Sequence, residues 1–280
     1  MRRSGLTDRV SGLGAHDHVC WHYRDGQEFR ARAREFLADG LDRGLQVWYV
    51  AAGAVAELAE DLRGDDSLAA ALRTGAARVV SLDATYPVGA VVEPASQVRA
   101  YADATAAALA AGFAGLRVAA DCTPLVRTPD QLAAFARYEH LVDHHMADHP
   151  FSAMCAYSAV EVDADAFDRI ACMHPGTNSP SPGFRLHAAG DRVVALGGEL
   201  DLHNEDLFAL ALRQAELRPR GGTVVLDARE LDFVDHRALI RLSSHVAAFD
   251  SEVVLRSPWT GVTTLVDLLG LDNIRVEAVS

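Results

Sequence analysis

The sequence contains no lysine, so all 26 of its basic residues are arginine. Without a side-chain amine, neither Schiff-base catalysis nor a P-loop lysine is possible. No apolar run approaches the roughly 20 residues that span a bilayer, and no apolar stretch follows the basic residues at the start of the chain. We therefore expect neither a membrane span nor a secretory signal, and we predict a cytoplasmic protein.

Positive charge and cysteine are both scarce. Acidic residues outnumber basic ones by 39 to 26, which gives a formal net charge of −13 at pH 7. Such an excess disfavours binding to nucleic acid or to an anionic membrane surface. The cysteines lie far apart and form no CxxC pair; they are Cys20, Cys122, Cys155 and Cys172. In a cytosolic chain this spacing predicts free thiols rather than disulfides.

The length and one break in the pattern indicate two domains. A chain of 280 residues has room for two domains of roughly 100–200 residues each. The clearest break is the segment PGTNSPSPG at 175–183, where proline, glycine and serine replace any periodic pattern. We predict an N-terminal tail over 1–13, a first domain over 14–175, a linker over 176–183 and a second domain over 184–280.

Both domains have the pattern of an α/β fold. Before the break, short apolar runs alternate with segments of helical period, which predicts a parallel sheet covered by helices. The expected strands of this sheet cover 18–23, 45–51, 77–82, 116–120 and 151–157. After the break, two adjacent strands over 184–189 and 192–200, joined by a turn at Gly190-Asp191, precede alternating helices and strands. The second domain is thus a small α/β domain.

The segment HDHVCWH is the densest group of ligand-type side chains. His16, His18, Cys20 and His22 follow one another at steps of two, so an extended conformation would place all of them on one face. Imidazole and thiol groups are preferred ligands of zinc and copper. Neighbours at this spacing lie about 6.5–7 Å apart along a strand. No more than two of them could share one ion without help from another element.

A second element for such a site is the helical segment EHLVDHH. His140 and His144 are one turn apart on this helix, and we predict a metal site, with zinc as one possible ion, from His16, His18, Cys20, His140 and His144. The order is not HExxH, because the acidic residue precedes the first histidine, so a metalloprotease would lack its base. Histidines near a helix C-terminus also complement the helix dipole without any metal, and this alternative stays open.

Several segments before the break together resemble a MEDS domain. They are HVCWHY at 18–23, GLQVWYVA at 44–51, LRVAADCT at 116–123, YEHLV at 138–142, FSAMCAYS at 151–158 and MHP at 173–175. This family consists of sensory modules thought to detect small hydrocarbon derivatives and is distantly similar to RecA-like ATPases. The resemblance implies a RecA-like parallel sheet, with sensing residues at His18 and Cys20 and, by a weaker match, at Cys155 and His174.

Two further residues complete the predicted ligand site, and one activity is excluded. His22 shares the strand of His18, and Cys122 follows a strand end, where open α/β sheets place ligands. After the strand over 45–51 the chain reads AGAVAELAE, without the glycines and lysine of a GxxxxGK[ST] loop, which excludes P-loop ATP hydrolysis. The chain also has neither a GxSxG elbow nor a GxGxxG after a strand. We expect a protein that is not an enzyme, with a metal-dependent enzyme built on the His/Cys residues as the alternative.

Three segments after the break resemble a STAS domain, the fold of anti-sigma-factor antagonists. They are GELDL at 198–202, VVLDARELDFVDHRAL at 224–239 and LVDLLGLD at 265–272. In that family an Asp-Ser-Ser-Gly turn carries a serine that a partner kinase phosphorylates, but the matching turn here is Asp235-His236-Arg237-Ala238. The resemblance therefore implies a partner surface without this phosphorylation switch. We place that surface around Asp201, His203, Asp235, His236 and Arg237.

The two resemblances together imply a cytoplasmic signalling regulator. Its first domain would bind a small molecule or a metal and control the second, which would engage an anti-sigma factor or a related serine-kinase-fold protein. Such control requires that the ligand favour one arrangement of the domains over another. A scaffold, in which the second domain only assembles complexes such as homo-oligomers, is the third possibility.

Overall fold

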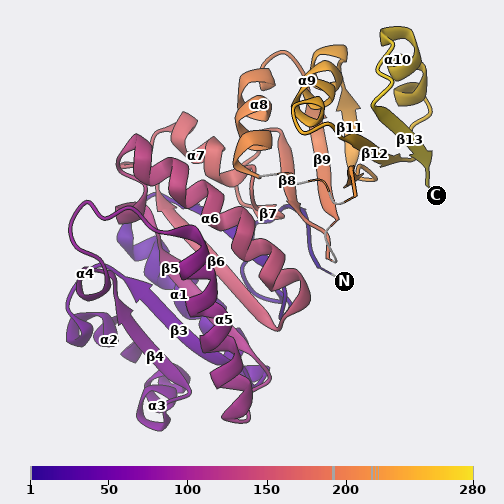
Figure 1. Ribbon diagram of the computed structural model, residues 1–280. Coiled ribbons are helices and arrows are strands. Elements are labelled where there is room, and N and C mark those ends of the chain that lie inside the picture. Colours follow the sequence, from indigo (N-terminus) through magenta and orange to yellow (C-terminus); the bar gives the residue numbers. More distant parts are fainter. Residues whose placement is uncertain (1, 191–192, 216, 218, 220, 280) are drawn as a thin grey trace.

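The computed structural model describes residues 2–190, 193–215, 217, 219 and 221–279. Figure 1 shows two α/β units that follow one another along the chain, each with its own sheet. The first sheet has seven strands in the order β1-β7-β2-β6-β5-β3-β4. The second has six, in the order β11-β9-β10-β12-β13 with β8 paired to β9. The predicted fold class is confirmed.

The first sheet is parallel at every described pairing. Its strands are β1 (Gly5–Leu6), β2 (His18–Tyr23), β3 (Gln46–Ala51), β4 (Ala77–Ser81), β5 (Leu116–Asp121), β6 (Phe151–Ser158) and β7 (Gly176–Thr177). The helices are α1 (Gly26–Asp42), α2 (Val55–Arg63), α3 (Asp66–Thr74), α4 (Leu82–Thr85), α5 (Pro94–Ala110), η1 (Thr123–Leu125), α6 (Pro129–Asp148) and α7 (Ala164–Ala171). The five predicted strands are confirmed, and β6 lies at the centre of the sheet.

Strand alternation divides the first core into two layers. Because successive side chains of a strand point to opposite faces, Val19 and Trp21 of β2 join the apolar cluster that includes Phe36 of α1. Cys20 joins the cluster on the other face, which includes Phe135 of α6. Helix α6 begins with a capping box at Thr128, whose hydroxyl accepts from Gln131 N. The α6 face of the sheet carries the candidate site described below.

The predicted tail and the predicted linker both contribute to the first sheet. Strand β1 lies within 1–13 and strand β7 within 176–183, and β7 pairs with both β1 and β2. Neither of these two strands was among the five predicted ones. Strands of two residues have no periodic pattern, which is why the sequence did not indicate them.

The second unit has a mixed sheet. Its strands are β8 (Phe184–Ala188), β9 (Val194–Leu200), β10 (Thr223–Asp227), β11 (Leu231–Val234), β12 (Glu252–Ser257) and β13 (Ile274–Ala278), and its helices are α8 (Glu205–Gln214), α9 (His236–Ala247) and α10 (Gly261–Leu269). Strands β8 and β9 pair antiparallel, as predicted, and the other described pairs are parallel. The predicted turn between them includes Asp191, which lies outside the described residues. Strand β11 was not predicted, because it is only four residues long.

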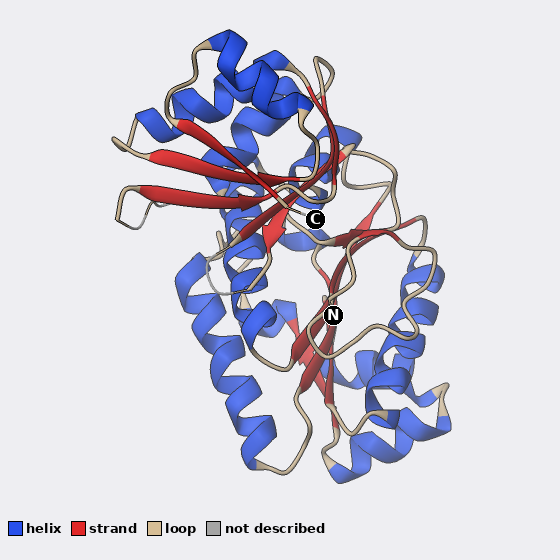
Figure 2. Cartoon of the chain, turned by 90° about the vertical axis from the view of Figure 1, so that its right-hand side faces the viewer, coloured by secondary structure: helices blue, strands red, loops and turns tan. Residues whose placement is uncertain are grey.

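The two units contact each other through the N-terminal segment and the end of α7. The N-terminal segment lies between the units (Figure 2), where Arg2 Nη1 donates to Ala188 O at 3.0 Å and Ser4 Oγ donates to Glu230 Oε2 at 2.6 Å. After α7, Cys172 and Met173 are buried in the apolar core of the second unit. Two residues that follow the last helix of the first unit thus pack in the core of the second unit. None of the helices within the described ranges has the length and apolar character needed to cross a membrane.

Candidate functional site

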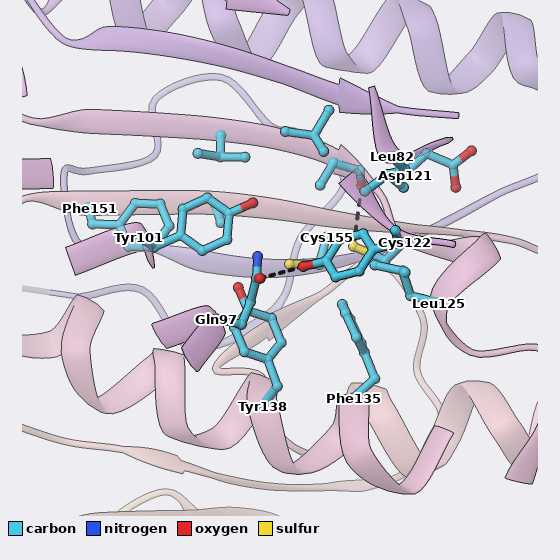
Figure 3. A pocket seen from close by; sticks show the side chains of 15 residues that line it. Leu82, Gln97, Tyr101, Asp121, Cys122, Leu125, Phe135, Tyr138, Phe151 and Cys155 are labelled. Carbon is cyan, nitrogen blue, oxygen red and sulfur yellow. Dashed lines mark hydrogen bonds between the residues drawn. The ribbon is translucent and has the colours of Figure 1, made fainter. Parts of the chain in front are cut away.

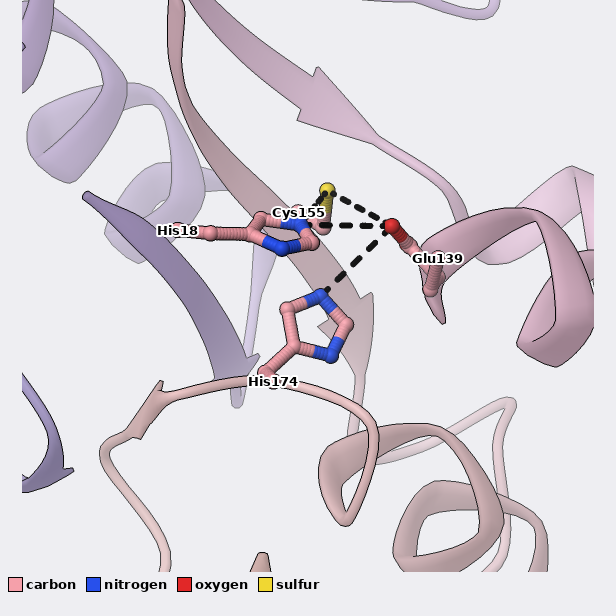
Figure 4. A group of neighbouring side chains, drawn as sticks. All are labelled: His18, Glu139, Cys155 and His174. Carbon is pink, nitrogen blue, oxygen red and sulfur yellow. Dashed lines mark hydrogen bonds and ion pairs between the residues drawn. The ribbon is translucent and has the colours of Figure 1, made fainter. Parts of the chain in front are cut away.

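Four buried side chains from four segments meet on the α6 face of the first sheet (Figure 4). They are His18 on β2, Glu139 on α6, Cys155 on β6 and His174 after α7. We call them the buried cluster. One ligand-type atom of each lies within 4.8 Å of those of the others. Strands β2 and β6 are neighbours in the sheet, so the fold brings together residues that are far apart in sequence.

Glu139 is the hub of the buried cluster. Its Oε2 atom lies 3.3 Å from His18 Nε2, 3.6 Å from Cys155 Sγ and 3.6 Å from His174 Nε2. Cys155 Sγ lies 3.4 Å from His18 Nε2. The other carboxylate oxygen of Glu139 accepts a hydrogen bond from Tyr157 OH at 2.5 Å. Imidazole, thiol and carboxylate are all metal-ligand groups, so the buried cluster could hold a metal ion.

The outer nitrogen of each imidazole is held by a neighbouring acceptor. His18 Nδ1 lies 3.0 Å from Asp143 Oδ1, and His174 Nδ1 lies 3.0 Å from Ile170 O. If each Nδ1 carries the proton, each Nε2 of a neutral ring is an acceptor directed into the cluster. Among the described residues, His174 Nε2 has no hydrogen-bond partner.

Asp143 connects the buried cluster to the second unit. Besides contacting His18, its carboxylate pairs with the Arg2 guanidinium and accepts a hydrogen bond from the backbone N–H of Ala188 at 2.7 Å. Ala188 is the last residue of β8. Asp143 lies one helical turn after Glu139 on α6, so both carboxylates face the same way. The same helix therefore contacts the cluster and the edge of the second sheet.

The electrostatics of these groups follow from burial and close pairing. Burial acts to lower the pKa of His18, but hydrogen bonds to Asp143 and Glu139 outweigh it and raise the pKa above its usual value. Burial acts to raise the pKa of Asp143, yet the charge of Arg2 and the contact with His18 hold it well below its usual range. Burial and then the neighbouring His18 lower the pKa of His174 to about 4. Asp143 is therefore ionised beside Arg2 and His18, and His174 is neutral.

A narrow apolar cavity of ≈ 30 Å³ adjoins the buried cluster (Figure 3). Figure 3 shows Tyr101 of α5 and Phe135 and Tyr138 of α6 around it. Cys155 lines the cavity and also belongs to the buried cluster. A cavity must offer roughly 10–15 Å³ to hold one water. This one accepts a molecule of only a few heavy atoms, which would touch the Cys155 thiol.

The structure brings some of the predicted ligand residues together and places the others elsewhere. His18, Cys155 and His174 meet in the buried cluster, and Cys122 lines the cavity. Cys20 is buried opposite Cys155 in the strand register but is not a member of the cluster. His22 stacks on Phe167 of α7, with ring centroids 4.0 Å apart. The four cysteines, all within the described ranges, are buried and free.

The predicted five-residue metal site does not form. His16 precedes β2, and its Nδ1 atom lies 2.9 Å from Met146 O. His140 and His144 lie together, with their Nε2 atoms 3.2 Å apart, and it is Glu139 and Asp143 that contact His18. The segment EHLVDHH contains two pairs of residues at a spacing of four, His140 with His144 and Glu139 with Asp143. The prediction used the histidine pair, but it is the acidic pair that faces His18.

The predicted partner residues lie at the surface where β9 and β11 end. Asp235 N donates to Leu200 O, which places the turns after these parallel strands side by side. The Asp235 carboxylate caps α9 by accepting from Ala238 N. Asp201 accepts from His203 N at 2.8 Å. Of this set, His203, His236 and Arg237 are exposed. Arg237 Nη1 lies 3.3 Å from Glu205 Oε2, so an acidic partner within the chain offsets its unfavourable position at a helix start.

Fold and site define a protein of two α/β units whose first unit encloses a cluster of ligand-type side chains beside a small cavity. The family model named MEDS, the methanogen/methylotroph, DcmR sensory domain, matches residues 17–175. The chain therefore belongs to the MEDS family, and its role is sensory. The match ends beside His174, so it includes every member of the buried cluster.

One solved structure is similar to a smaller part of the chain. It is the anti-sigma factor antagonist SpoIIAA in its unphosphorylated form, which is 19% identical over 34% of this chain and 88% of that one, with a TM-score of 0.26. A search of curated proteins finds no match.

Proposed function

We propose that this protein is a cytoplasmic signalling regulator rather than an enzyme. Its first unit binds a small molecule beside the buried cluster, and its second unit engages a protein partner. Membership of a sensory family supports the first part. The observation that carries the proposal is the position of Asp143, which contacts both His18 of the buried cluster and Ala188 of β8.

The cavity supports a small apolar ligand. Its walls are mostly aliphatic and aromatic, with the Cys122 and Cys155 sulfurs among them. A small apolar compound of one to three carbon atoms suits this lining and volume. A ligand that contacts the Cys155 thiol also alters a group 3.4 Å from His18. Binding in the cavity thereby reaches the residue that pairs with Asp143.

Two routes connect the ligand site with the second unit. The first runs from His18 through Asp143 to the N–H of Ala188. The second runs through the backbone, because Met173 is buried in the second core and His174, the next residue, belongs to the buried cluster. A ligand that binds better to one arrangement of these contacts shifts the population toward it. By linkage, the partner and the ligand then change each other's affinity by the same factor.

The output surface is the group Asp201, His203, Asp235, His236 and Arg237. The STAS resemblance of the sequence supports an anti-sigma factor or a related serine-kinase-fold protein as the partner. Because the turn at 235–238 has no serine, we propose that the ligand, and not phosphorylation, controls this surface.

Hydrogen exchange on the full chain tests the proposal. The probes are haloalkanes and alcohols of one to three carbon atoms, added singly. We expect at least one of them to protect amides of α5 and α6 around the cavity and to change the exchange of β8 and of the first turn of α9. Ala120→Leu, which fills the cavity, should abolish both effects. Binding that leaves the second unit unchanged, or no binding by any compound, would contradict the proposal.

A further inference from the structure

We propose that His18, Glu139, Cys155 and His174 together bind one divalent cation of the zinc type in a four-coordinate site. The site adjoins the cavity of the proposed function, but the inference depends on the geometry of the four side chains and not on the identity of any ligand in the cavity.

The types of donor atom select the ion. Two imidazole nitrogens, one sulfur and one carboxylate oxygen match the ligands of zinc, whereas magnesium and calcium take oxygen ligands. A thiolate and a carboxylate also supply two negative charges. These balance a divalent cation, so the occupied site carries no net charge into a buried region. The neighbouring Asp143 is balanced separately by Arg2.

Four of the six distances between the donor atoms are those of a tetrahedron around a metal ion. Zinc binds nitrogen at 2.0–2.1 Å and sulfur at about 2.3 Å, so tetrahedral ligand atoms lie about 3.3–3.6 Å from each other. In the buried cluster, Glu139 Oε2 lies 3.3 Å from His18 Nε2 and 3.6 Å from both Cys155 Sγ and His174 Nε2. The separation of Cys155 Sγ and His18 Nε2 is 3.4 Å. Four of the six edges of the tetrahedron are therefore in place. The other two run from His174 Nε2 to His18 Nε2 and to Cys155 Sγ; they lie within 4.8 Å and close as the ion binds.

The second shell also has the pattern of a metal site. A metal-binding histidine usually donates its other ring N–H to a carboxylate or a backbone carbonyl, which fixes the ring and the tautomer. His18 has Asp143 in this position, and His174 has the carbonyl of Ile170. Tyr157 holds the second oxygen of Glu139. A neighbouring group thus orients each of the two imidazoles and the Glu139 carboxylate toward the centre of the buried cluster.

A purely hydrogen-bonded network explains the buried cluster less well. His18 and the Cys155 thiol can each donate to Glu139, but His174 Nε2 is left without a hydrogen-bond partner among the described residues. An unsatisfied buried acceptor is costly. A cation at the centre of the cluster would satisfy this atom and the lone pairs of the other three ligands together.

The test measures metal in the whole chain by two routes. Because the four ligands are buried, we expect the ion to enter during folding and to exchange slowly. The first route is native mass spectrometry and elemental analysis of protein expressed with added zinc. The second is refolding with cobalt(II), where a thiolate-to-cobalt absorption band identifies a sulfur ligand. We expect one ion per chain and this band in the wild-type protein.

Matched variants identify the ligands. Cys155→Ser should remove the thiolate-to-cobalt band, and His174→Gln should reduce the metal content at least tenfold. His144→Gln, which changes another α6 histidine, should leave both unchanged. Far-ultraviolet circular dichroism checks that each variant folds. If a ligand variant does not fold, the cobalt band of the wild-type protein still shows whether a thiolate binds the metal.

Two results would overturn the metal site. One is wild-type protein with less than a tenth of an ion per chain by both routes, and the other is an unchanged cobalt spectrum in both ligand variants. Failure of the metal site is distinct from failure of the proposed function. A metal-free chain whose second unit still responds to a compound in the cavity would refute only the metal site. A metal-loaded chain without such a response would refute only the proposed function.

Discussion

The two units of this protein bury different chemistry. The first unit encloses Arg117, Glu139, Asp143 and several histidines, whereas the described buried residues of the second unit include no carboxylate and no guanidinium. The second core is aliphatic and aromatic, and its predicted partner residues lie outside it. Buried ion pairs are weak sources of stability compared with well-packed apolar residues. The comparison indicates that the first interior contains groups able to bind a ligand, whereas the described core of the second unit serves packing alone.

Not every buried charge in the first unit belongs to the sensing site. Arg117 lies on the α1 face, where it donates to Asp39 Oδ2 at 2.6 Å, to Ser152 Oγ at 3.0 Å and to the carbonyl of Leu13 at 2.6 Å. These bonds hold the N-terminal segment against the sheet. The guanidinium of Arg117 donates its hydrogen bonds to groups of the protein. His174 Nε2, in contrast, has no hydrogen-bond partner in the described ranges. Arg117 therefore has a structural role in this unit.

The largest expected effect is at the link between the units. Asp143→Ala leaves Arg2 and His18 without their buried counter-charge and should lower the free energy of unfolding by about 3–5 kcal/mol. Urea denaturation measures this loss. Asp148→Asn, at an exposed position of the same helix, should change stability by less than about 0.5 kcal/mol. Equal effects of the two variants would show that Asp143 is not a link.

The stability of the second unit should depend instead on close backbone packing. Gly198 has φ +87°, and a Cβ atom there would lie 2.2 Å from the carbonyl oxygen of Gly183. Gly198→Ala should therefore cost about 3 kcal/mol. Gly270 also has a positive φ of +62°, but a Cβ atom there meets no described atom within 4 Å, so Gly270→Ala should cost about 1 kcal/mol. Thermal unfolding that ranks these two variants in the opposite order would contradict this account.

Acid should weaken the first unit before the second. Burial and the neighbouring His144 lower the pKa of His140 to about 3, whereas an unfolded histidine titrates near 6.5. Below pH 6.5 the unfolded chain therefore binds more protons at this site, and the stability that neutral His140 provides at higher pH is lost. The expected loss is about 2 kcal/mol between neutral pH and pH 5.

The matched variant for this pH effect is His140→Gln. Urea unfolding of the variant at pH 7, 6 and 5 should show a shallower decline than that of the wild-type protein. In the metal-free protein His18 acts in the opposite direction, because its raised pKa provides stability that is present below pH 6.5 and lost as the pH rises through the folded value. Parallel declines in the two proteins would show that His140 is not neutral in the folded state.

The smallest effect on stability should come from the output surface. Arg237 and Arg241 both pair with Glu205 on the exposed face of the second unit. Alanine at either position should leave the urea midpoint unchanged, because exposed ion pairs contribute little. Arg237→Ala should nevertheless weaken binding of an anti-sigma factor in calorimetry, whereas Arg241→Ala should not. Equal binding by the two variants would place the partner elsewhere.

The sequence predicted the periodic elements well and the site only in part. Strand β2 was predicted with its observed ends, because HVCWHY is an apolar run bounded by polar residues. The two-residue strands β1 and β7 carry no such pattern. Cys155 and His174 were named from a family resemblance, and His18 was named both from its spacing and from that resemblance. Glu139 was not named. No local pattern shows that four residues between positions 18 and 174 meet at one point, since only the pairing of β2 with β6 and the packing of α6 bring them together.

The most direct test of the account is the exchange rate of the Ala188 amide hydrogen. Glu139→Gln removes the charge at the hub of the buried cluster without touching Ala188, and the comparison is Glu161→Gln, which changes an exposed residue paired with Arg127. If the cluster is coupled to the second unit through His18 and Asp143, Ala188 and the rest of β8 should exchange at least tenfold faster in Glu139→Gln than in Glu161→Gln. Faster exchange confined to α6 and β2, with β8 unchanged, would show that the two units are not coupled.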